Sequence, residues 1–208
     1  MKKIFLLLAV AATAVACNDM NDSMLSPEEV FSSEIEELIK SQDGKFNDDE
    51  FYAKLTSSVA IRTESIFYLH DGTISLSGMI EDNIPETNEY LFFNDNTYWA
   101  CFDPYYHIGA EYPDPPVVGA IRNEWNYDYE SNEITVIWKE RFHGNKLYEW
   151  VSKVVYFDGD TMILRGRFSL FDDTYKEVIR IFSLKDGREE YEKKYECNID
   201  EYLEDSFE

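Results

Sequence analysis

The chain has 208 residues, of which 42 are acidic and 19 are basic, so its formal charge at neutral pH is -23. A surface this acidic repels phosphate backbones and anionic lipid headgroups, which argues against a nucleic-acid-binding protein. Once a removable N-terminal segment is set aside, the length suits a single domain with a substantial core.

The first residues have the features of an export signal. Lys2 and Lys3 form a positive start, residues 4–15 are predominantly apolar, and small residues surround the position where a signal peptidase would cut. The apolar run is shorter than the roughly 20 residues that a membrane-spanning helix needs. We therefore expect a cleaved signal peptide over residues 1–16.

Cys17 follows directly, and the segment around it resembles the lipobox of bacterial lipoproteins. In that family the cysteine becomes the mature N-terminus and carries acyl chains, so the resemblance implies a lipidated Cys17 and an outer-membrane lipoprotein. Several acyl chains anchor a protein stably where one does not. Ala14 departs from the family pattern, which usually has Leu there. The alternative is plain secretion by cleavage at the same bond, which would leave Cys17 as a free thiol.

Residues 17–26 are polar and acidic and show no periodicity, so they are expected to form a flexible tether. An acidic stretch just behind the cysteine resembles a surface-export signal in lipoproteins of Gram-negative gut anaerobes. Asp19 and Asp22 make a short version of it. The sequence therefore leaves open whether the protein lies on the cell surface or on the periplasmic side of the outer membrane.

Two helices are predicted over residues 27–58. Ser26 is a suitable N-cap for the first helix, and acidic residues follow it in the first turn. Asn47 is a suitable N-cap for the second, with Phe46 and Phe51 spaced as a hydrophobic staple. We expect these helices to cover one end of the domain that follows or to pack on its outside.

Residues 59–184 contain nine segments rich in β-branched and aromatic residues, separated by polar turns. Short strands at this spacing are typical of an antiparallel meander that closes into a barrel or folds into a sandwich, and nine strands are close to what an up-and-down barrel requires. Alternation of apolar and polar residues, as at Ile134 and Val136, gives each strand one buried face. The fold class is therefore all-β, with strands expected at residues 60–69, 73–80, 89–93, 97–102, 121–129, 133–142, 147–157, 162–171 and 175–184.

Three of the turns carry a more specific pattern: residues 90–98 read YLFFNDNTY, residues 125–129 read WNYDY, and residues 156–164 read YFDGDTMIL. They resemble the F-x-x-D-G-T-Y, W-x-Y-D and L-D-G-D-x-L-x-L motifs of small lipocalin-like lipoproteins of Gram-negative gut anaerobes. The resemblance covers residues 59–184 and implies an up-and-down antiparallel barrel with short N-terminal helices. For activity it implies almost nothing, because folds do not carry function by themselves. Asn96 stands where the pattern has Gly.

The segment from residue 103 to residue 119 is rich in proline and aromatic residues. A stiff aromatic loop at a barrel mouth suits recognition of sugars or flat apolar ligands, and the alternative is simple packing on the rim. The candidate ligand-binding residues of this loop are Tyr105, Tyr106, His107 and Tyr112. The tryptophans of the predicted strands either line an internal cavity or belong to the core, and Trp99 and Trp125 join the candidates.

No pattern in the sequence predicts a metal or a cofactor. His70, His107 and His143 are far apart in the chain and lack the spacing of a zinc site. The motifs of serine hydrolases, P-loop proteins and dinucleotide-binding proteins are also missing. Whether two of the many acidic residues form the carboxylate pair of a hydrolase is left open, because only their geometry could identify such a pair. We find no catalytic constellation.

Cys101 and Cys197 are candidates for one disulfide, because an exported domain reaches an oxidising compartment. Cys197 lies in the acidic tail, residues 185–208, so this bond would join the tail to the barrel. Tyr191, Tyr195 and Ile199 recur in the tail at helical spacing.

These observations favour a membrane-anchored lipoprotein that acts as a non-enzymatic binding module for a small apolar or sugar-like ligand. The first alternative is a structural or assembly lipoprotein that binds another envelope protein. The second, weaker alternative is a hydrolase. A ligand binder should enclose a cavity behind Trp and Tyr side chains, whereas a filled core with an exposed apolar patch would favour a protein partner.

Overall fold

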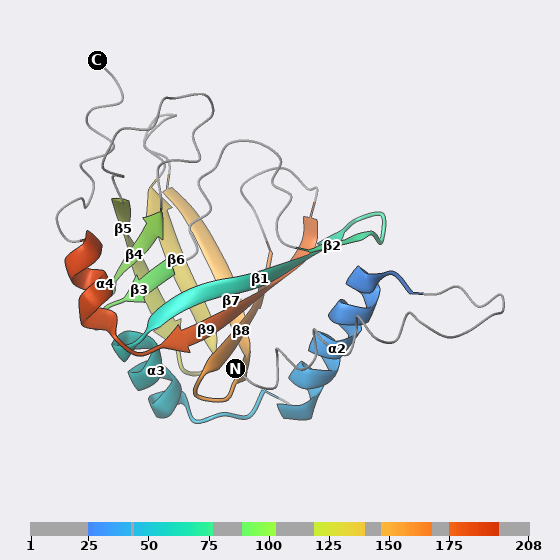
Figure 1. Ribbon diagram of the computed structural model, residues 1–208, viewed down its shortest axis with the longest axis horizontal. Coiled ribbons are helices and arrows are strands. Elements are labelled where there is room, and N and C mark those ends of the chain that lie inside the picture. Colours follow the sequence, from blue (N-terminus) through green and yellow to red (C-terminus); the bar gives the residue numbers. More distant parts are fainter. Residues whose placement is uncertain are drawn as a thin grey trace, which may run out of the picture.

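The computed structural model describes residues 25–42, 44–76, 89–102, 119–139, 147–167 and 175–195, and its central feature is a closed antiparallel β-barrel (Figure 1). Each strand pairs antiparallel with its neighbours, and β1 closes the ring by pairing with β9 along its whole length. This confirms the predicted all-β, up-and-down barrel with N-terminal helices. Its strands are β1 (Val59–Leu69), β2 (Ile74–Leu76), β3 (Glu89–Phe92), β4 (Thr97–Phe102), β5 (Gly119–Asp128), β6 (Glu133–Lys139), β7 (Leu147–Phe157), β8 (Thr161–Gly166) and β9 (Tyr175–Lys185).

Two of the nine described strands together fill one position of the barrel. β9 occupies one edge of β1, so β2 and β3 must both lie on the other edge. β2 pairs with β1 near Phe67, and β3 pairs with it near Ala60. The barrel therefore has eight strand positions.

The tight turns have the backbone that their residues favour. Asn96 and Asn132 have φ values of 65° and 58°, and Gly159 has a φ of 94°. Asn is one of the few residues other than glycine that enters this left-handed region readily. Asn96 therefore replaces the glycine of the motif without disturbing the β3–β4 hairpin.

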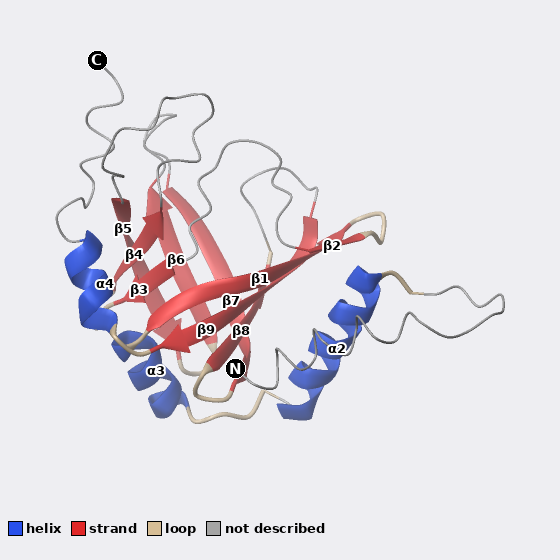
Figure 2. Cartoon of the chain, in the orientation of Figure 1, coloured by secondary structure: helices blue, strands red, loops and turns tan. Residues whose placement is uncertain are grey.

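Helix α3 (Asp48–Ser57) closes one end of the barrel (Figures 1 and 2). Asn47 caps the helix, since its Oδ1 accepts a hydrogen bond from the Glu50 amide at 3.1 Å. Phe51 and Leu55 are completely buried and belong to the same core cluster as the side chains of the barrel interior. The predicted staple also forms, with ring centroids of Phe46 and Phe51 5.5 Å apart.

Helix α2 (Pro27–Gln42) packs on the outside of the barrel (Figure 2). Ile35 and Ile39 lie against Ile66, Ile163 and Ile179, which belong to the outer faces of β1, β8 and β9. The expectation that the N-terminal helices cover an end or pack outside is confirmed, because α3 does the first and α2 the second.

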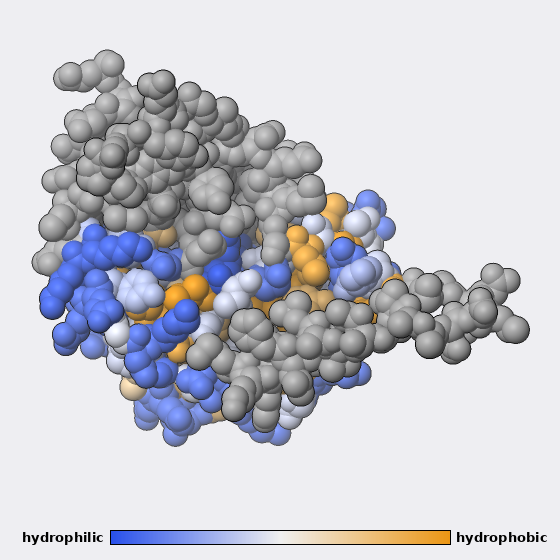
Figure 3. All heavy atoms as spheres, viewed as in Figure 1, coloured by the Kyte–Doolittle hydropathy of each residue, from blue (hydrophilic) through white to orange (hydrophobic). Residues whose placement is uncertain are grey.

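Helix α4 (Arg188–Tyr195) covers another part of the outer face and confirms the helical spacing seen in the tail. Tyr195 is buried against Leu91, Trp99 and Cys101, and its hydroxyl donates a hydrogen bond to Glu89. Figure 3 shows that hydrophilic side chains dominate the exposed surfaces of α3 and α4 on this face. None of the helices that the structure describes is long and apolar enough to span a bilayer.

Candidate ligand-binding site

The barrel interior is densely packed at the end that α3 covers. The Phe51 ring contacts the rings of Tyr127 and Phe157, with centroid distances of 5.1 and 5.2 Å. Trp125 stacks on Tyr52 and donates a hydrogen bond from its Nε1 to the carbonyl of Phe93 at 3.0 Å. The aromatic rings fill this end, and the Trp125 indole has its hydrogen-bond partner.

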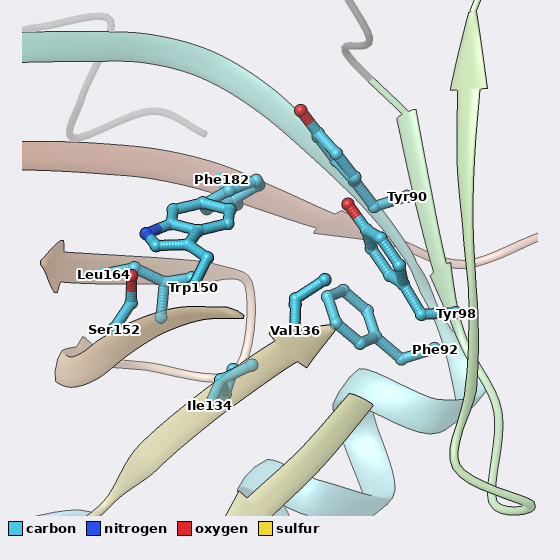
Figure 4. A pocket seen from close by; sticks show the side chains of 9 residues that line it. All are labelled: Tyr90, Phe92, Tyr98, Ile134, Val136, Trp150, Ser152, Leu164 and Phe182. Atoms are coloured by element: carbon cyan, nitrogen blue, oxygen red, sulfur yellow. The ribbon is translucent and has the colours of Figure 1, made fainter. Parts of the chain in front are cut away.

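A small cavity of about 10 Å³ lies further along the interior (Figure 4). This volume is roughly what one water molecule requires. Eight apolar or aromatic side chains and one serine line the cavity: Tyr90, Phe92, Tyr98, Ile134, Val136, Trp150, Leu164, Phe182 and Ser152. Tyr90 and Tyr98 stack with a centroid distance of 5.8 Å, and their hydroxyls point to the same side.

Two polar atoms at this cavity have no hydrogen-bond partner among the described residues. They are Nε1 of Trp150 and Oγ of Ser152, which project inward from β7. The Ser152 side chain is only 3% exposed. An unpartnered polar group in a protein interior costs about 1–3 kcal/mol, so such groups mark places where an additional molecule would be stabilising.

A buried cation lies next to the cavity. Arg180 of β9 is 4% exposed, and its guanidinium carbon lies 3.7 Å from the centroid of the Trp150 ring. Burial lowers the pKa of Arg180 to about 9, with a further contribution from the positive charge of Arg62. The group is still protonated at neutral pH, so the interior of this acidic protein holds a positive charge.

A β-bulge in β1 determines which residues face this charge. Ala60 and Arg62 pair with the inward residues Leu184 and Phe182, so strict alternation would turn Glu64 inward as well. The register shifts between Arg62 and Glu64, which pairs Glu64 with the outward residue Ile181. Ser65 is therefore the residue opposite Arg180, and its buried Oγ also has no partner within the described part of the chain.

The acidic side chains with clearly shifted pKa values lie in caps and turns. Hydrogen bonds from the backbone of Thr73 and Glu130 lower the pKa values of Asp71 and Asp128, and the Thr97 side chain does the same for Asp95. A general acid would need the opposite shift. Within the described ranges, no cluster of three or more His, Cys, Asp or Glu residues is arranged to hold a metal.

The residues predicted from sequence are dispersed. Trp125 is in the interior at the α3 end, whereas Trp99 is on the outer face beneath α4, and neither lines the cavity. Trp150 of β7 does line it. The loop residues Tyr105, Tyr106, His107 and Tyr112 lie outside the described residues, as does Cys17.

Cys101 is buried and forms no disulfide with any described residue, and burial raises the pKa of its thiol. It lies beneath α4 next to Trp99 and Tyr195. Its predicted partner, Cys197, lies outside the described residues, so the disulfide stays a prediction.

Sequence reasoning missed Arg180, Ser152 and Ser65. Arg180 offered a signal, because it is the single charged residue in the apolar run Val178-Ile179-Arg180-Ile181-Phe182. A charge in the middle of a central strand is uncommon and points to a buried polar site. The two serines offered no such signal, since serine is common on either face of a strand.

Comparison with protein-family models and with curated proteins gives no match for this chain, so the site rests on its own geometry.

Proposed function

We propose that the protein is a non-enzymatic binding module that takes a small, largely apolar ligand into the barrel interior, at the cavity beside Trp150 and Ser152. The cavity carries this proposal, because it joins an apolar and aromatic lining to the unpartnered polar atoms of Trp150 and Ser152. Binding sites for small molecules are characteristically apolar with a few polar groups. A ligand larger than one water molecule requires the lining side chains to move, as often happens on binding.

The closed end of the barrel supports one direction of entry. α3 blocks the end formed by the turns at residues 93–96, 129–132 and 158–160. Trp150 lies towards the opposite end, because β7 begins at Leu147 on that side and ends at Phe157 beside the turn at residues 158–160. We therefore propose that a ligand enters from the side away from α3.

We infer in addition that Cys17 is lipidated and anchors the module to the outer membrane, with the side of the membrane left open. The lipobox-like segment supports this, as does the family that the hairpin motifs resemble. Mass analysis of the N-terminal peptide from membrane fractions should show acyl chains on Cys17. Cys17→Ala should leave the protein unacylated and outside the membrane fraction, and an unmodified cysteine in membrane-bound wild-type protein would contradict the anchor.

The alternative of an assembly lipoprotein that binds an envelope protein requires a sizeable apolar surface. Among the described residues, the exposed large apolar side chains are Leu25, Tyr129 and Val151, which come from separate elements. Single exposed side chains of this kind are ordinary. The described surface therefore favours the ligand-binding proposal.

Native mass spectrometry tests the proposal on the chain from Asn18 onward, which contains every described helix and strand, after export into a bacterial periplasm. We expect a bound mass that leaves on denaturation. Val136→Phe fills the cavity and should abolish the bound mass. Val151→Phe makes the same change on an exposed outer position and should retain it. A wild-type protein without bound mass, or equal binding by the two variants, would contradict the proposal.

A further inference from the structure

We propose that the ligand is an amphipathic carboxylate, whose anionic group lies between Arg180, Trp150 and Ser152 and whose apolar part occupies the aromatic interior. This inference rests on the proposed binding function and names the chemical class of its ligand. It rests on three features of this part of the barrel: the positive charge of Arg180, the hydrogen-bond donors of Trp150 and Ser152, and the apolar side chains that line the cavity.

The sign of the interior charge is the first reason. The chain as a whole carries a charge of -23, yet among the described residues the charged side chains that the register turns inward beside the cavity are Arg62 and Arg180. The bulge after Arg62 turns Glu64 to the outer face and places Ser65 opposite Arg180. An acidic protein that keeps cations inside and directs the neighbouring acid outward is arranged to attract an anion.

The hydrogen-bonding groups are the second reason. The Trp150 indole nitrogen can only donate, and the Ser152 hydroxyl can donate once an acceptor is present. Both are without a partner among the described residues. A carboxylate only accepts hydrogen bonds and offers about four positions for them, so it matches a guanidinium and two donors better than a neutral hydroxyl does.

The position of the guanidinium is the third reason. The Arg180 guanidinium carbon lies 3.7 Å from the centroid of the Trp150 ring, which places its charge next to the indole donor. Ser152 lies two residues further along the same inward face of β7. The cation and the two donors thus come from two rigid strands, which is the arrangement that a preformed binding site requires.

The remaining lining defines the rest of the ligand. Five of the side chains present only carbon to the cavity, and Tyr90 and Tyr98 add rings with one hydroxyl each; the five are Phe92, Ile134, Val136, Leu164 and Phe182. A sugar would leave most of its hydroxyls unsatisfied against these side chains, which is costly. A short alkyl or aryl group would bury apolar surface there. Together the two halves of the site fit an amphipathic carboxylate.

Octanoate and 1-octanol test this inference, because the two probes share an alkyl chain and differ in the charged group. Isothermal titration calorimetry of the chain from Asn18 onward should show octanoate binding at least about tenfold more tightly than 1-octanol. Arg180→Met should reduce octanoate affinity by about tenfold or more and leave 1-octanol affinity unchanged, because a hydrogen-bonded charge is lost. Arg122→Met, the same change at an exposed position on β5, should bind as the wild type does.

Ser152→Ala provides a second variant that removes one donor and little volume. Its octanoate affinity should fall about tenfold with 1-octanol affinity preserved. Equal affinities for the two probes in the wild type, or unchanged octanoate affinity in Arg180→Met and Ser152→Ala, would overturn the carboxylate assignment. In that case, if Val136→Phe bound neither octanoate nor 1-octanol, the result would still support binding in the barrel. Absence of heat with either probe overturns the assignment, and the bound mass then decides the proposed function separately.

Discussion

The two halves of the barrel interior differ in how their side chains pack and in whether their polar atoms have hydrogen-bond partners. At the α3 end, Phe51, Tyr127 and Phe157 pack ring against ring, and Trp125 has a hydrogen-bond acceptor. In the other half, Trp150 and Ser152 have polar atoms without partners in the described chain. The first half is an aromatic core in which the Trp125 indole has its acceptor, and the second is a partly satisfied polar pocket.

This difference separates stability from binding within one barrel. Close-packed aromatic rings give the fold its free energy of unfolding. Buried charges and unpartnered donors lower it, and natural proteins retain such costly groups mainly at functional sites. Substitutions in the two halves should therefore have different consequences.

Phe51→Ala should give the largest effect. The side chain is fully buried between Phe46, Tyr127 and Phe157, so its removal leaves a cavity and should lower the free energy of unfolding by about 3–5 kcal/mol. Urea denaturation measures this. Glu50→Ala on the exposed side of α3 should change it by about 0.5 kcal/mol or less. A loss below about 1 kcal/mol for Phe51→Ala would mean that α3 does not form part of the core.

Gly166→Ala should give the next largest effect, at the border between the halves. A Cβ at Gly166 would lie 2.5 Å from Ser152 Oγ and 2.7 Å from the carbonyl oxygen of Val151. The serine can rotate, but the backbone carbonyl cannot, so we expect a loss of about 1–3 kcal/mol in thermal or urea unfolding. Octanoate affinity should fall as well, because Ser152 is displaced. Unchanged stability would contradict the close approach of β7 and β8.

Tyr127→Phe should lower stability by about 1–2 kcal/mol at neutral pH, because the hydroxyl donates a hydrogen bond to Asp48. Burial, followed by this bond, raises the pKa of Tyr127 in the folded protein. The folded state then keeps a proton that the unfolded chain loses near pH 10, so this contribution to stability is complete below pH 10 and is lost as the pH rises further.

The difference in unfolding free energy between the wild type and Tyr127→Phe should therefore narrow between about pH 9 and pH 11. Chemical denaturation across this range measures it. A difference that stays constant or widens would show that the hydroxyl is not buried against Asp48.

Arg180→Met should give the smallest effect on stability. The substitution removes the desolvation cost of a buried guanidinium and also its contact with Trp150, so we expect a net change between a loss of about 1 kcal/mol and a gain of about 2 kcal/mol. Arg165→Met makes the same change on the outer face, where Arg165 forms an ion pair with Glu36 of α2. This control should lower the free energy of unfolding by about 1 kcal/mol. A loss above about 2 kcal/mol for Arg180→Met would assign Arg180 a structural role.

Much of the fold was predictable from local chemistry. Asn47 and Ser26 marked the helix starts, because a short polar side chain satisfies a free backbone amide there. Turns such as the one at Gly159 separated the strands in the order that the barrel uses. Each of these signals is contained in a few neighbouring residues.

The candidate site was less predictable, since it depends on which face each strand residue takes. In β4 both Tyr98 and Trp99 are buried, one in the barrel and one beneath α4, so the aromatic pattern does not distinguish inside from outside. In β1 the bulge reverses the expected faces of Glu64 and Ser65. Both features arise from tertiary packing that the sequence pattern does not contain.

The separation of the two halves can be tested in one spectrum. The chain has four tryptophans, and ¹H–¹⁵N NMR resolves their indole N–H groups. On titration with octanoate, the Trp150 resonance should shift strongly because its Nε1 gains an acceptor, while the Trp125 resonance should shift less because its Nε1 already bonds Phe93. Assignment by Trp150→Phe and Trp125→Phe identifies the two signals. A larger shift of Trp125 than of Trp150, or no shift at either residue, would contradict a binding site beside Trp150.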